Sequence, residues 1–415
     1  MRPLKLLLIV IVLCGLMPMF GAPASAAPRA VCVSSGNGNW GDISWTCGST
    51  PTASDIVIVN DGHTVTLNAD ASVYQLIVGG GVSGILTHDG NAARTLTVGT
   101  GGLSVSTGGA FTTPLSQLTV NGNTTVNGTL TANGTVDLNG DLSNSGTLNG
   151  GSALIQITGN ATLGASFGAG TGMLELNGTG AQSLSVGSAL NNLTLNKASG
   201  TASLVSNATV NGILALTLGD LDAGSNTLTM GLGATTTGDY DVLGKVLRAS
   251  PGTGALSYGS WYTTLNFTGA VTGDVSVTMS KQAPVGLGTK YVRRKYTLTV
   301  PVGNTATVRL HYRDSDLNDP PVTESNLMLF RYDSSAGRWV MINPTARSDG
   351  PENNYLEATG IMTFSEWAMS SQASPTAVTL NDFTARTLET PAWLAFALGG
   401  AIGLIVVAGA LRARK

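Results

Sequence analysis

The sequence contains little charge, little histidine and little cysteine. Charged residues are 11% of its 415 residues, against about 25% in an average soluble domain. Only 3 histidines and 3 cysteines occur, so the side chains that most often build catalytic or metal sites are scarce. The formal net charge is -3, so the chain lacks the excess of basic residues that is typical of nucleic-acid-binding proteins. The sequence therefore predicts no nucleic-acid partner, and it nominates no catalytic residue, no cofactor and no metal site.

Apolar residues are nevertheless 42% of the chain, which is enough to bury cores. The N-terminal segment has the pattern of a secretory signal peptide. Arg2 and Lys5 precede an apolar run, and 24–26 (Ala-Ser-Ala) fit the small-x-small cleavage rule, so 1–26 are predicted to be removed. Cys14 lies inside the apolar run without a small residue before it, which disfavours a lipoprotein.

Cys32 and Cys47 are the only cysteines of the predicted mature chain. In an exported protein such a pair most often forms a disulfide. Closing a loop of that length stabilises by about 3 kcal/mol in the chain-entropy model. A metal site is disfavoured, because His63 and His88 are too far along the chain to complete one with finger-type spacing.

The C-terminal segment is predicted to cross a membrane. Residues 392–411 form a run of 20 residues without a charge, which matches the roughly 30 Å hydrocarbon core of a bilayer. The basic tail, 412–415, then places the bulk of the chain outside a single-pass cell membrane protein. A buried core helix is the alternative and fits the basic end less well. The arrangement resembles the C-terminal sorting signals of bacterial surface proteins, although no Leu-Pro-x-Thr-Gly motif occurs.

The portion between these ends divides by charge. Residues 27–240 hold 3 basic and 11 acidic side chains, whereas 241–371 hold 12 and 11. A composition change of this size indicates a domain boundary, which lies near Gly238. The expected order is an N-terminal cap at 27–67, a β-solenoid at 68–240, a β-sandwich at 241–371 and a short stalk at 372–391.

The solenoid prediction comes from a repeat. Asn-Gly recurs at 121, 127, 133, 139 and 149, and short segments that alternate apolar residues with Thr, Ser or Asn lie between. Strands this short are stable when successive turns stack and cover one another. With about 20 residues per coil, about nine coils are expected, and right-handed coils are preferred over left-handed coils with hexapeptide edges. Hairpins with Asn-Gly turns are the main local alternative.

Residues 36–240 carry a resemblance to a known class. Trp40 and Trp45 are followed by Pro-Thr-Ala-Ser-Asp-Ile-Val-Ile at 51–58 and by Gly-His-x-Val-x-Leu at 62–67. These features resemble the start of exported bacterial parallel β-helix proteins, and 189–200 resemble a repeat of the same class. The class includes adhesins, structural layers and polysaccharide-active enzymes. The resemblance implies a parallel β-helix. The two tryptophans are expected to cover its open end, because a solenoid exposes an apolar cross-section there.

Residues 241–371 show strand-like segments separated by turns, which predicts a β-sandwich like those that follow β-helices in bacterial surface proteins. Arg309, His311 and Arg313 alternate with apolar residues, which indicates one solvated face. The fold class is therefore all-β: a parallel β-helix or solenoid, then a β-sandwich, with a C-terminal single transmembrane helix.

Several polar motifs have a functional and a structural interpretation. Asp220 and Asp222 would place two carboxylates on one strand face about 6.6 Å apart, as a hydrolase requires, but a solvated corner explains them equally well. Lyases of this architecture need a base beside an acidic cluster, and neither Arg94 nor Lys197 has one. The eight Asn-x-Ser/Thr sequons are interpreted as turns.

Three motifs remain in or near the second region. Asp314 to Asp319 alternates oxygen ligands as calcium loops do. It lacks the loop glycine, and Ser325 stands where Glu is required, so a polar turn is favoured. The run 293–295 (Arg-Arg-Lys) could meet an acidic polysaccharide or lipid, but a solvated strand edge is favoured. His63, His88 and His311 are isolated from any nucleophile.

The sequence thus favours a cell-surface structural or adhesive protein that displays a rigid β-solenoid for glycan or protein contact. Its partners would be the membrane, through the C-terminal helix, and extracellular glycans or surface proteins. The alternative is a polysaccharide-active β-helix enzyme, a hydrolase or a lyase.

Overall fold

The computed structural model describes residues 29–91 and 93–371. In these residues the chain forms thirty-six strands and two short 3-10 helices. Contacts divide the chain into two compact units, 1–279 with 299–306 and 280–298 with 307–415. The predicted signal peptide (1–26), stalk (372–391), transmembrane helix (392–411) and basic tail (412–415) lie outside the described residues. Among the described residues, no helix has the length and apolar character needed to span a bilayer.

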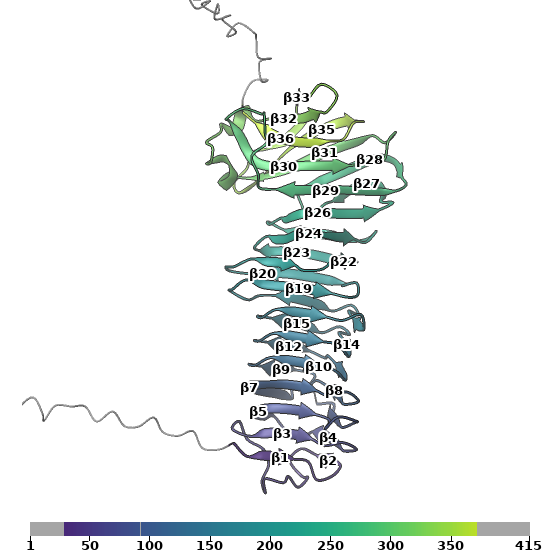
Figure 1. The fold of residues 1–415 in the computed structure, drawn as a ribbon, viewed down its shortest axis with the longest axis vertical. Helices are drawn as coiled ribbons and strands as arrows, with labels where there is room; N and C mark the ends of the chain where they lie inside the picture. The colour runs from purple at the N-terminus through teal and green to yellow at the C-terminus, as the bar shows by residue number, and fades with distance from the viewer. Residues whose placement is uncertain (1–28, 92, 372–415) are drawn as a thin grey trace, which may run out of the picture. The chain divides into compact units, whose positions relative to one another are not determined.

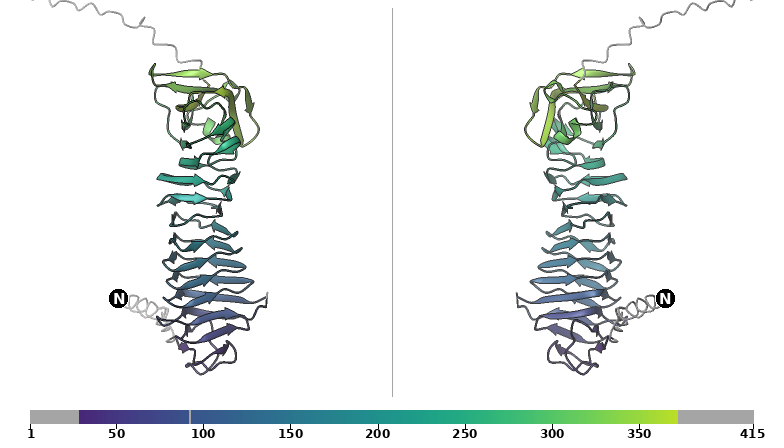
Figure 2. Two further views of the ribbon diagram at one scale, coloured as in Figure 1. Left: turned by 90° about the vertical axis from the view of Figure 1, so that its right-hand side faces the viewer. Right: turned by 90° about the vertical axis from the view of Figure 1, so that its left-hand side faces the viewer.

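The first unit is a parallel β-solenoid of about 10 turns, and Figures 1 and 2 show its strands stacked along one axis. One coil consists of β12 (Thr135–Leu138), β13 (Leu142–Asn144) and β14 (Thr147–Asn149). Each strand pairs in parallel with its counterpart in the next coil, as Thr135 does with Leu154, 19 residues later. Stacked coils are therefore confirmed, and the Asn-Gly hairpin alternative is wrong for this stretch.

Three ladders of strands build the coil walls, and the long strands β5 (Ala71–Val78), β7 (Thr95–Val105) and β24 (Leu221–Met230) turn a corner and join two ladders. Ladder A contains β9 (Gln117–Val120), β12, β15 (Leu154–Ile157), β18 (Met173–Leu176), β20 (Asn192–Asn196), β23 (Ile213–Leu218) and β25 (Thr235–Gly238). Ladder B contains β1 (Val31–Val33), β3 (Ile56–Val59), β10 (Thr124–Val126), β13, β16 (Ala161–Leu163), β19 (Gln182–Val186) and β21 (Ala202–Leu204). Ladder C contains β2 (Gly38–Asn39), β4 (Thr64–Leu67), β6 (Ile85–His88), β8 (Ala110–Thr112), β11 (Thr129–Thr131), β14 and β17 (Phe167–Gly168), and β22 (Ala208–Val210) pairs with the end of β24.

The interior of the solenoid follows from the period-2 pattern of the strands. Because neighbouring coils pair in register, each inward side chain lies above its counterpart one coil away. Burying such a side chain contributes about 1.5–3 kcal/mol, so the stack is held mainly by repeated apolar contact. One file of buried residues along ladder A is Leu96, Leu118, Val136, Ile155, Leu174, Leu193 and Leu214.

The corners explain why Asn, Asp and Gly recur in the sequence. The Asp141 amide donates to Asn123 Oδ1 at 3.0 Å, and the Asn160 amide donates to Asp141 Oδ1 at 2.7 Å. Each side chain thus satisfies a backbone donor of the following coil, which would otherwise lack a partner at the bend. Glycine is required where coils approach most closely, since a Cβ on Gly146 would lie 2.2 Å from the Gly128 carbonyl oxygen.

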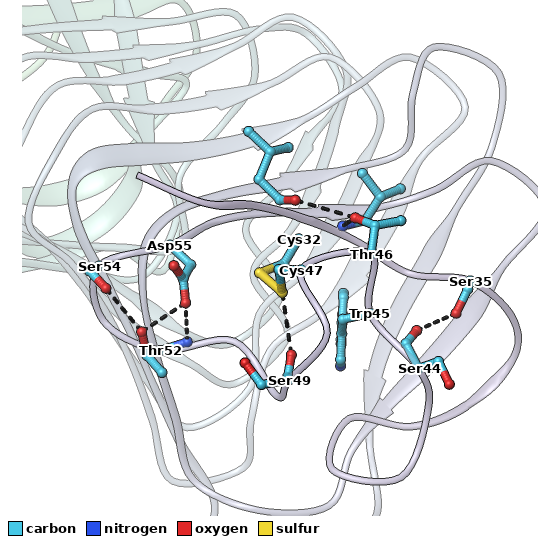
Figure 3. Close-up of a disulfide and its surroundings, with 12 residues drawn as sticks. Cys32, Ser35, Ser44, Trp45, Thr46, Cys47, Ser49, Thr52, Ser54 and Asp55 are labelled. Carbon is cyan, nitrogen blue, oxygen red and sulfur yellow. Dashed lines mark hydrogen bonds between the residues drawn. A yellow bond between two sulfur atoms is a disulfide. The ribbon is translucent and has the colours of Figure 1, made fainter. Parts of the chain in front are cut away.

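The N-terminal end of the solenoid carries two buried tryptophans, Trp40 and Trp45, and the disulfide. Figure 3 shows the disulfide and Trp45. The Trp40 and Trp45 rings lie 4.9 Å apart, and Trp45 Nε1 donates to the Trp40 carbonyl oxygen at 3.0 Å. The predicted disulfide is confirmed, because Cys32 is bonded to Cys47, 15 residues later. Cys32 belongs to β1, which pairs with β3, so the disulfide fastens the Trp45 segment to the first coil.

At the other end of the solenoid the strand pairing changes direction. The strand β26 (Val242–Ala249) pairs in parallel with β24 and antiparallel with β29 (Asp274–Ser280). Arg248 of β26 is 1% exposed and donates to the carbonyl oxygens of Ser257, Gly231 and Ala234 at 3.0, 2.8 and 2.7 Å. The antiparallel hairpin of β27 (Gly252–Ser257) and β28 (Thr264–Val271) completes this end.

The second unit contains two groups of strands. In the first, β36 (Glu366–Ser370) lies between β30 (Tyr291–Thr299) and β32 (Met328–Asp333), and β33 (Arg338–Ile342) pairs with β32, all antiparallel. In the second, β35 (Asn353–Ile361) lies between β31 (Ala306–Arg313) and β34 (Ala346–Ser348). The 3-10 helices η1 (Asp314–Leu317) and η2 (Glu324–Asn326) connect β31 to β32. Whether the two groups constitute a β-sandwich stays a prediction.

Candidate functional site

A cleft of about 470 Å³ opens on the second unit. By contrast, two voids inside the solenoid measure about 10 Å³ each, the space of about one water. The cleft falls within the roughly 300–1,000 Å³ range of small-molecule sites. Its lining residues are Val285, Lys295, Thr297, Tyr332, Ser334, Ser365 and Glu366.

Strand register brings the charged residues of the cleft together. Thr297 of β30 is paired with Glu366 of β36, and Lys295 is two residues before Thr297 on the same strand face. Lys295 Nζ consequently reaches Glu366 Oε1 at 3.1 Å. The two side chains stay 27% and 39% exposed, so the ion pair remains accessible to a ligand from solvent.

Tyr332 of β32 supplies the aromatic ring of the cleft and is held from two sides. Its ring meets that of Trp339 edge-on, with centroids 5.4 Å apart, and its carbonyl oxygen accepts from Ser365 Oγ at 2.7 Å. Trp339 Nε1 donates to the Val285 carbonyl oxygen at 2.9 Å, which fixes the loop that forms the rim. Tyr332 also packs on the buried cluster of Leu287, Phe330, Trp339 and Ala368.

The cleft combines charged, hydroxyl and aromatic side chains. It presents one cation, one anion, three hydroxyl side chains and a phenol ring on three neighbouring strands and on the residues next to them. Such a set can donate and accept several hydrogen bonds and offer an apolar face. Because the strands hold the side chains in place, a ligand would meet groups that are already positioned.

The predicted basic run 293–295 is divided by the strand alternation. Arg293 is 51% exposed and lies 3.7 Å from Asp319. Arg294 is fully buried, and its Nε donates to Asp316 Oδ2 at 2.6 Å. Lys295 alone reaches the cleft, so the three residues form no single basic patch.

The three histidines lie apart and serve local contacts. His311 is fully buried, so the expectation that it lies on a solvated face is wrong. It follows buried Leu310 in an irregular stretch of β31, where its Nδ1 lies 3.3 Å from Arg294 and its Nε2 lies 3.0 Å from Asn353 Oδ1. His63 Nδ1 lies 2.9 Å from Ser34 Oγ, and His88 Nδ1 accepts a backbone hydrogen bond.

The predicted carboxylate pair lies at a solenoid corner. Asp220 and Asp222 flank the inward Leu221, as the alternation requires. Asp220 Oδ1 accepts from the Asp241 amide at 3.0 Å, and Asp222 Oδ1 accepts from the Gly224 amide at 2.8 Å. Both carboxylates therefore hold backbone at the bend, as in the corner interpretation.

The calcium-loop candidate, Asp314 to Asp319, begins with the 3-10 helix η1. Asp314 accepts from Asn354 Nδ2 at 2.8 Å and from the Glu352 amide at 3.1 Å. Asp316 accepts from Arg294 and from the Arg313 amide. These oxygens bind protein donors, in accord with a polar turn. Within 29–91 and 93–371, no group of three or more His, Cys, Asp or Glu side chains could hold a metal ion.

Most of the cleft could not be found from the sequence. Tyr332, Ser334, Ser365 and Glu366 carry no motif, and Glu366 is 71 residues from Lys295. Only the antiparallel pairing of β30, β36 and β32 brings them together. Comparisons with family models, with curated proteins and with solved structures find no match to this chain.

Proposed function

We propose that the protein is a cell-surface structural and adhesive protein, which displays its rigid β-solenoid for contact with glycans or proteins. The observation that carries this proposal is the row of polar side chains along the outer face of ladder A. Register aligns Thr97, Thr119, Asp137 and Gln156, one per coil, on the face opposite the buried file. The row repeats hydrogen-bonding groups at about 4.8 Å.

A repeated row supports adhesion for an energetic reason. One hydrogen bond at an exposed surface contributes about 0.5–1.5 kcal/mol, which is too little for a lasting contact. Several bonds on one rigid face act together, because the first contact raises the effective concentration of the others. A solenoid also avoids the entropy cost of ordering a flexible binding loop.

The proposed location rests on sequence features together with the disulfide. A disulfide such as that between Cys32 and Cys47 is typical of proteins in an oxidising, extracellular compartment. The signal-peptide pattern of 1–26 and the apolar run at 392–411 add export and a single-pass anchor with the basic tail inside. Together they support a solenoid held outside the cell membrane.

Adhesion of beads coated with the full-length chain to glycan-coated and cell surfaces tests the proposal. The triple variant Thr119→Ala, Asp137→Ala, Gln156→Ala removes the ladder A row. The matched control, Thr125→Ala, Ser143→Ala, Thr162→Ala, removes outward side chains of ladder B in the same coils. We expect at least a tenfold loss of adhesion for the first variant and little loss for the second.

Two outcomes would contradict the proposal. One is that wild-type beads do not adhere above uncoated beads. The other is that the chain cleaves polygalacturonate or a similar polymer and that Asp220→Ala with Asp222→Ala abolishes the cleavage, which would establish the enzyme alternative.

A further inference from the structure

We propose that the cleft of the second unit binds one pyranose unit of a neutral saccharide. This inference rests on the proposed function, because it names a glycan as the contact and adds a defined subsite to the repeated surface of the solenoid. It is carried by the cleft itself, by the Lys295–Glu366 pair and by the position of Tyr332.

A pyranose ring has an apolar face of C–H groups and a rim of hydroxyls, and the cleft offers the complement of both. The Tyr332 ring supplies an aromatic surface for the C–H face. Glu366 accepts and Lys295 donates, with their polar atoms 3.1 Å apart. Two vicinal hydroxyls, one donating and one accepting, match this pair, and bonds to charged groups are stronger than neutral ones.

The charge of the cleft favours a neutral sugar over an acidic one. The Lys295 ammonium is already paired with Glu366, and the remaining lining residues, Val285, Thr297, Tyr332, Ser334 and Ser365, are uncharged. A sugar carboxylate would therefore approach the Glu366 carboxylate without a free cation to offset the repulsion. A polyol needs no net charge, and it can bond with both members of the ion pair.

The side chains that line the cleft are also held in place before a ligand binds. Lys295 and Thr297 come from β30, Glu366 comes from β36, and Tyr332 comes from β32, which are adjacent antiparallel strands. Trp339 holds both the Tyr332 ring and the Val285 rim. Binding would order few additional side chains, so a small number of contacts can produce measurable affinity.

Calorimetric titration of the purified full-length chain tests the inference. The neutral probes are cellotriose, maltotriose and mannotriose, and digalacturonate is the acidic probe. We expect saturable binding of at least one neutral probe, binding at least tenfold weaker in Glu366→Gln and Lys295→Met, and weaker binding of digalacturonate than of that probe.

Matched controls separate the cleft from general effects. Glu357→Gln removes the carboxylate of another ion pair of the second unit, in which Arg309 and Glu357 lie 2.8 Å apart. Trp261→Ala removes a 55% exposed aromatic side chain of the first unit. Both variants are expected to bind like wild type. Tyr332→Ala is expected to abolish binding. If this variant unfolds because Tyr332 also packs on Trp339, the variants of the partly exposed Lys295 and Glu366 decide the test.

The inference is overturned if no neutral probe binds, if digalacturonate binds more tightly than every neutral probe, or if Glu366→Gln and Glu357→Gln weaken binding equally. These results are distinct from failure of the proposed function. Beads that fail to adhere, with a cleft that still binds a trisaccharide, reject the adhesive role alone. Beads that adhere equally with wild-type protein and with Glu366→Gln, with no binding in solution, reject the cleft alone.

Discussion

The solenoid and the second unit are stabilised by interiors of different composition. In the solenoid, one pattern of short alternating strands repeats, and inward files of Val, Leu and Ile provide the contacts. In the second unit, the buried side chains include Arg294 and His311, which bond to groups on other elements. Repetition allows an interior that is mainly apolar, although the solenoid also buries polar side chains such as Lys197 and Gln182. In both units the buried polar groups need hydrogen-bond partners.

Buried cations show the contrast most clearly. Lys197 in the solenoid is 3% exposed, and its Nζ donates to the carbonyl oxygens of Gly178 and Gly180 and to Gln182 Oε1, at 2.6, 2.9 and 2.7 Å. Arg294 in the second unit is instead paired with the carboxylate of Asp316. A corner of the solenoid supplies carbonyl groups as partners, and the second unit supplies an opposite charge.

The largest expected effect is the loss of the Arg294 guanidinium. Arg294→Met leaves Asp316 as a largely buried charge without its partner, which costs about 3–5 kcal/mol of folding stability. Arg293→Met is the control, because Arg293 is 51% exposed, and it should change stability by less than about 0.5 kcal/mol. Denaturant unfolding followed by tryptophan fluorescence measures both. Equal and small losses would show that the second unit does not depend on its buried ion pair.

A slightly smaller loss is expected from the solenoid interior. Leu118→Ala opens a cavity in the fully buried file of ladder A and should cost about 2–5 kcal/mol. The adjacent outward residue of the same strand provides the control, and Gln117→Ala should change stability by less than about 0.5 kcal/mol. Urea unfolding followed by far-UV circular dichroism gives both values. Similar effects at the two positions would contradict the inward and outward assignment of β9.

The disulfide allows the stabilities of the two units to be measured separately, because it lies in the first unit alone. Replacing Cys32 and Cys47 by serine should lower the stability of the first unit by about 3 kcal/mol, through the entropy of the released loop. Reduction of the wild-type protein should reproduce this loss, and the unfolding transition of the second unit should not move, since 280–298 and 307–415 contain no cysteine. A shift of both transitions would mean that the units unfold together.

Alkaline pH should reveal the smallest difference. Burial raises the pKa of Tyr258 in the first unit and of Tyr312 in the second, and Glu324 further raises the pKa of Tyr312. An unfolded tyrosine ionises near pH 10, where the folded chain still keeps its proton. The stability from these phenols is therefore complete below about pH 10 and declines as the pH rises above it.

Phenylalanine substitutions distinguish the two tyrosines. The Tyr258 hydroxyl is buried without a hydrogen-bond partner, so Tyr258→Phe should raise stability by about 1 kcal/mol and reduce the alkaline loss. Tyr312→Phe should instead lower stability by about 1–3 kcal/mol at pH 7, because the Tyr312 hydroxyl donates to Glu324 at 3.0 Å. Urea midpoints at pH 7 and pH 10.5 test both, and a loss of stability in Tyr258→Phe at pH 7 would refute the assignment.

The solenoid could be predicted from the sequence because its cause is local and repeated. Apolar residues such as Val126 and Leu130 alternate with polar residues along successive strands, and Asn-Gly recurs at the corners between 121 and 150. The disulfide followed from there being only two cysteines after the predicted cleavage site. The coil length of about 20 residues was close to the observed steps of 18 and 19 residues.

The second unit could not be predicted to the same depth, because its contacts join residues that are far apart in the sequence. The solvated strand edge expected for 293–295 is wrong at Arg294, which is fully buried, and no sequence signal indicates that Asp316 receives its side chain. The irregular burial at Leu310 and His311 likewise breaks the period on which the solvated-face expectation depended. The cleft depends on which strand pairs with which, and that information lies in the fold.

The in-register stacking of the coils limits how the length of the first unit can change. An insertion or deletion of a few residues within a coil would move inward residues to the outside and misalign the corner side chains of Asn123, Asp141 and Asn160 with their amides. Adding or removing a whole coil would keep both in place, and it would lengthen or shorten the first unit by about 4.8 Å. The length of the first unit can therefore change in steps of one whole coil.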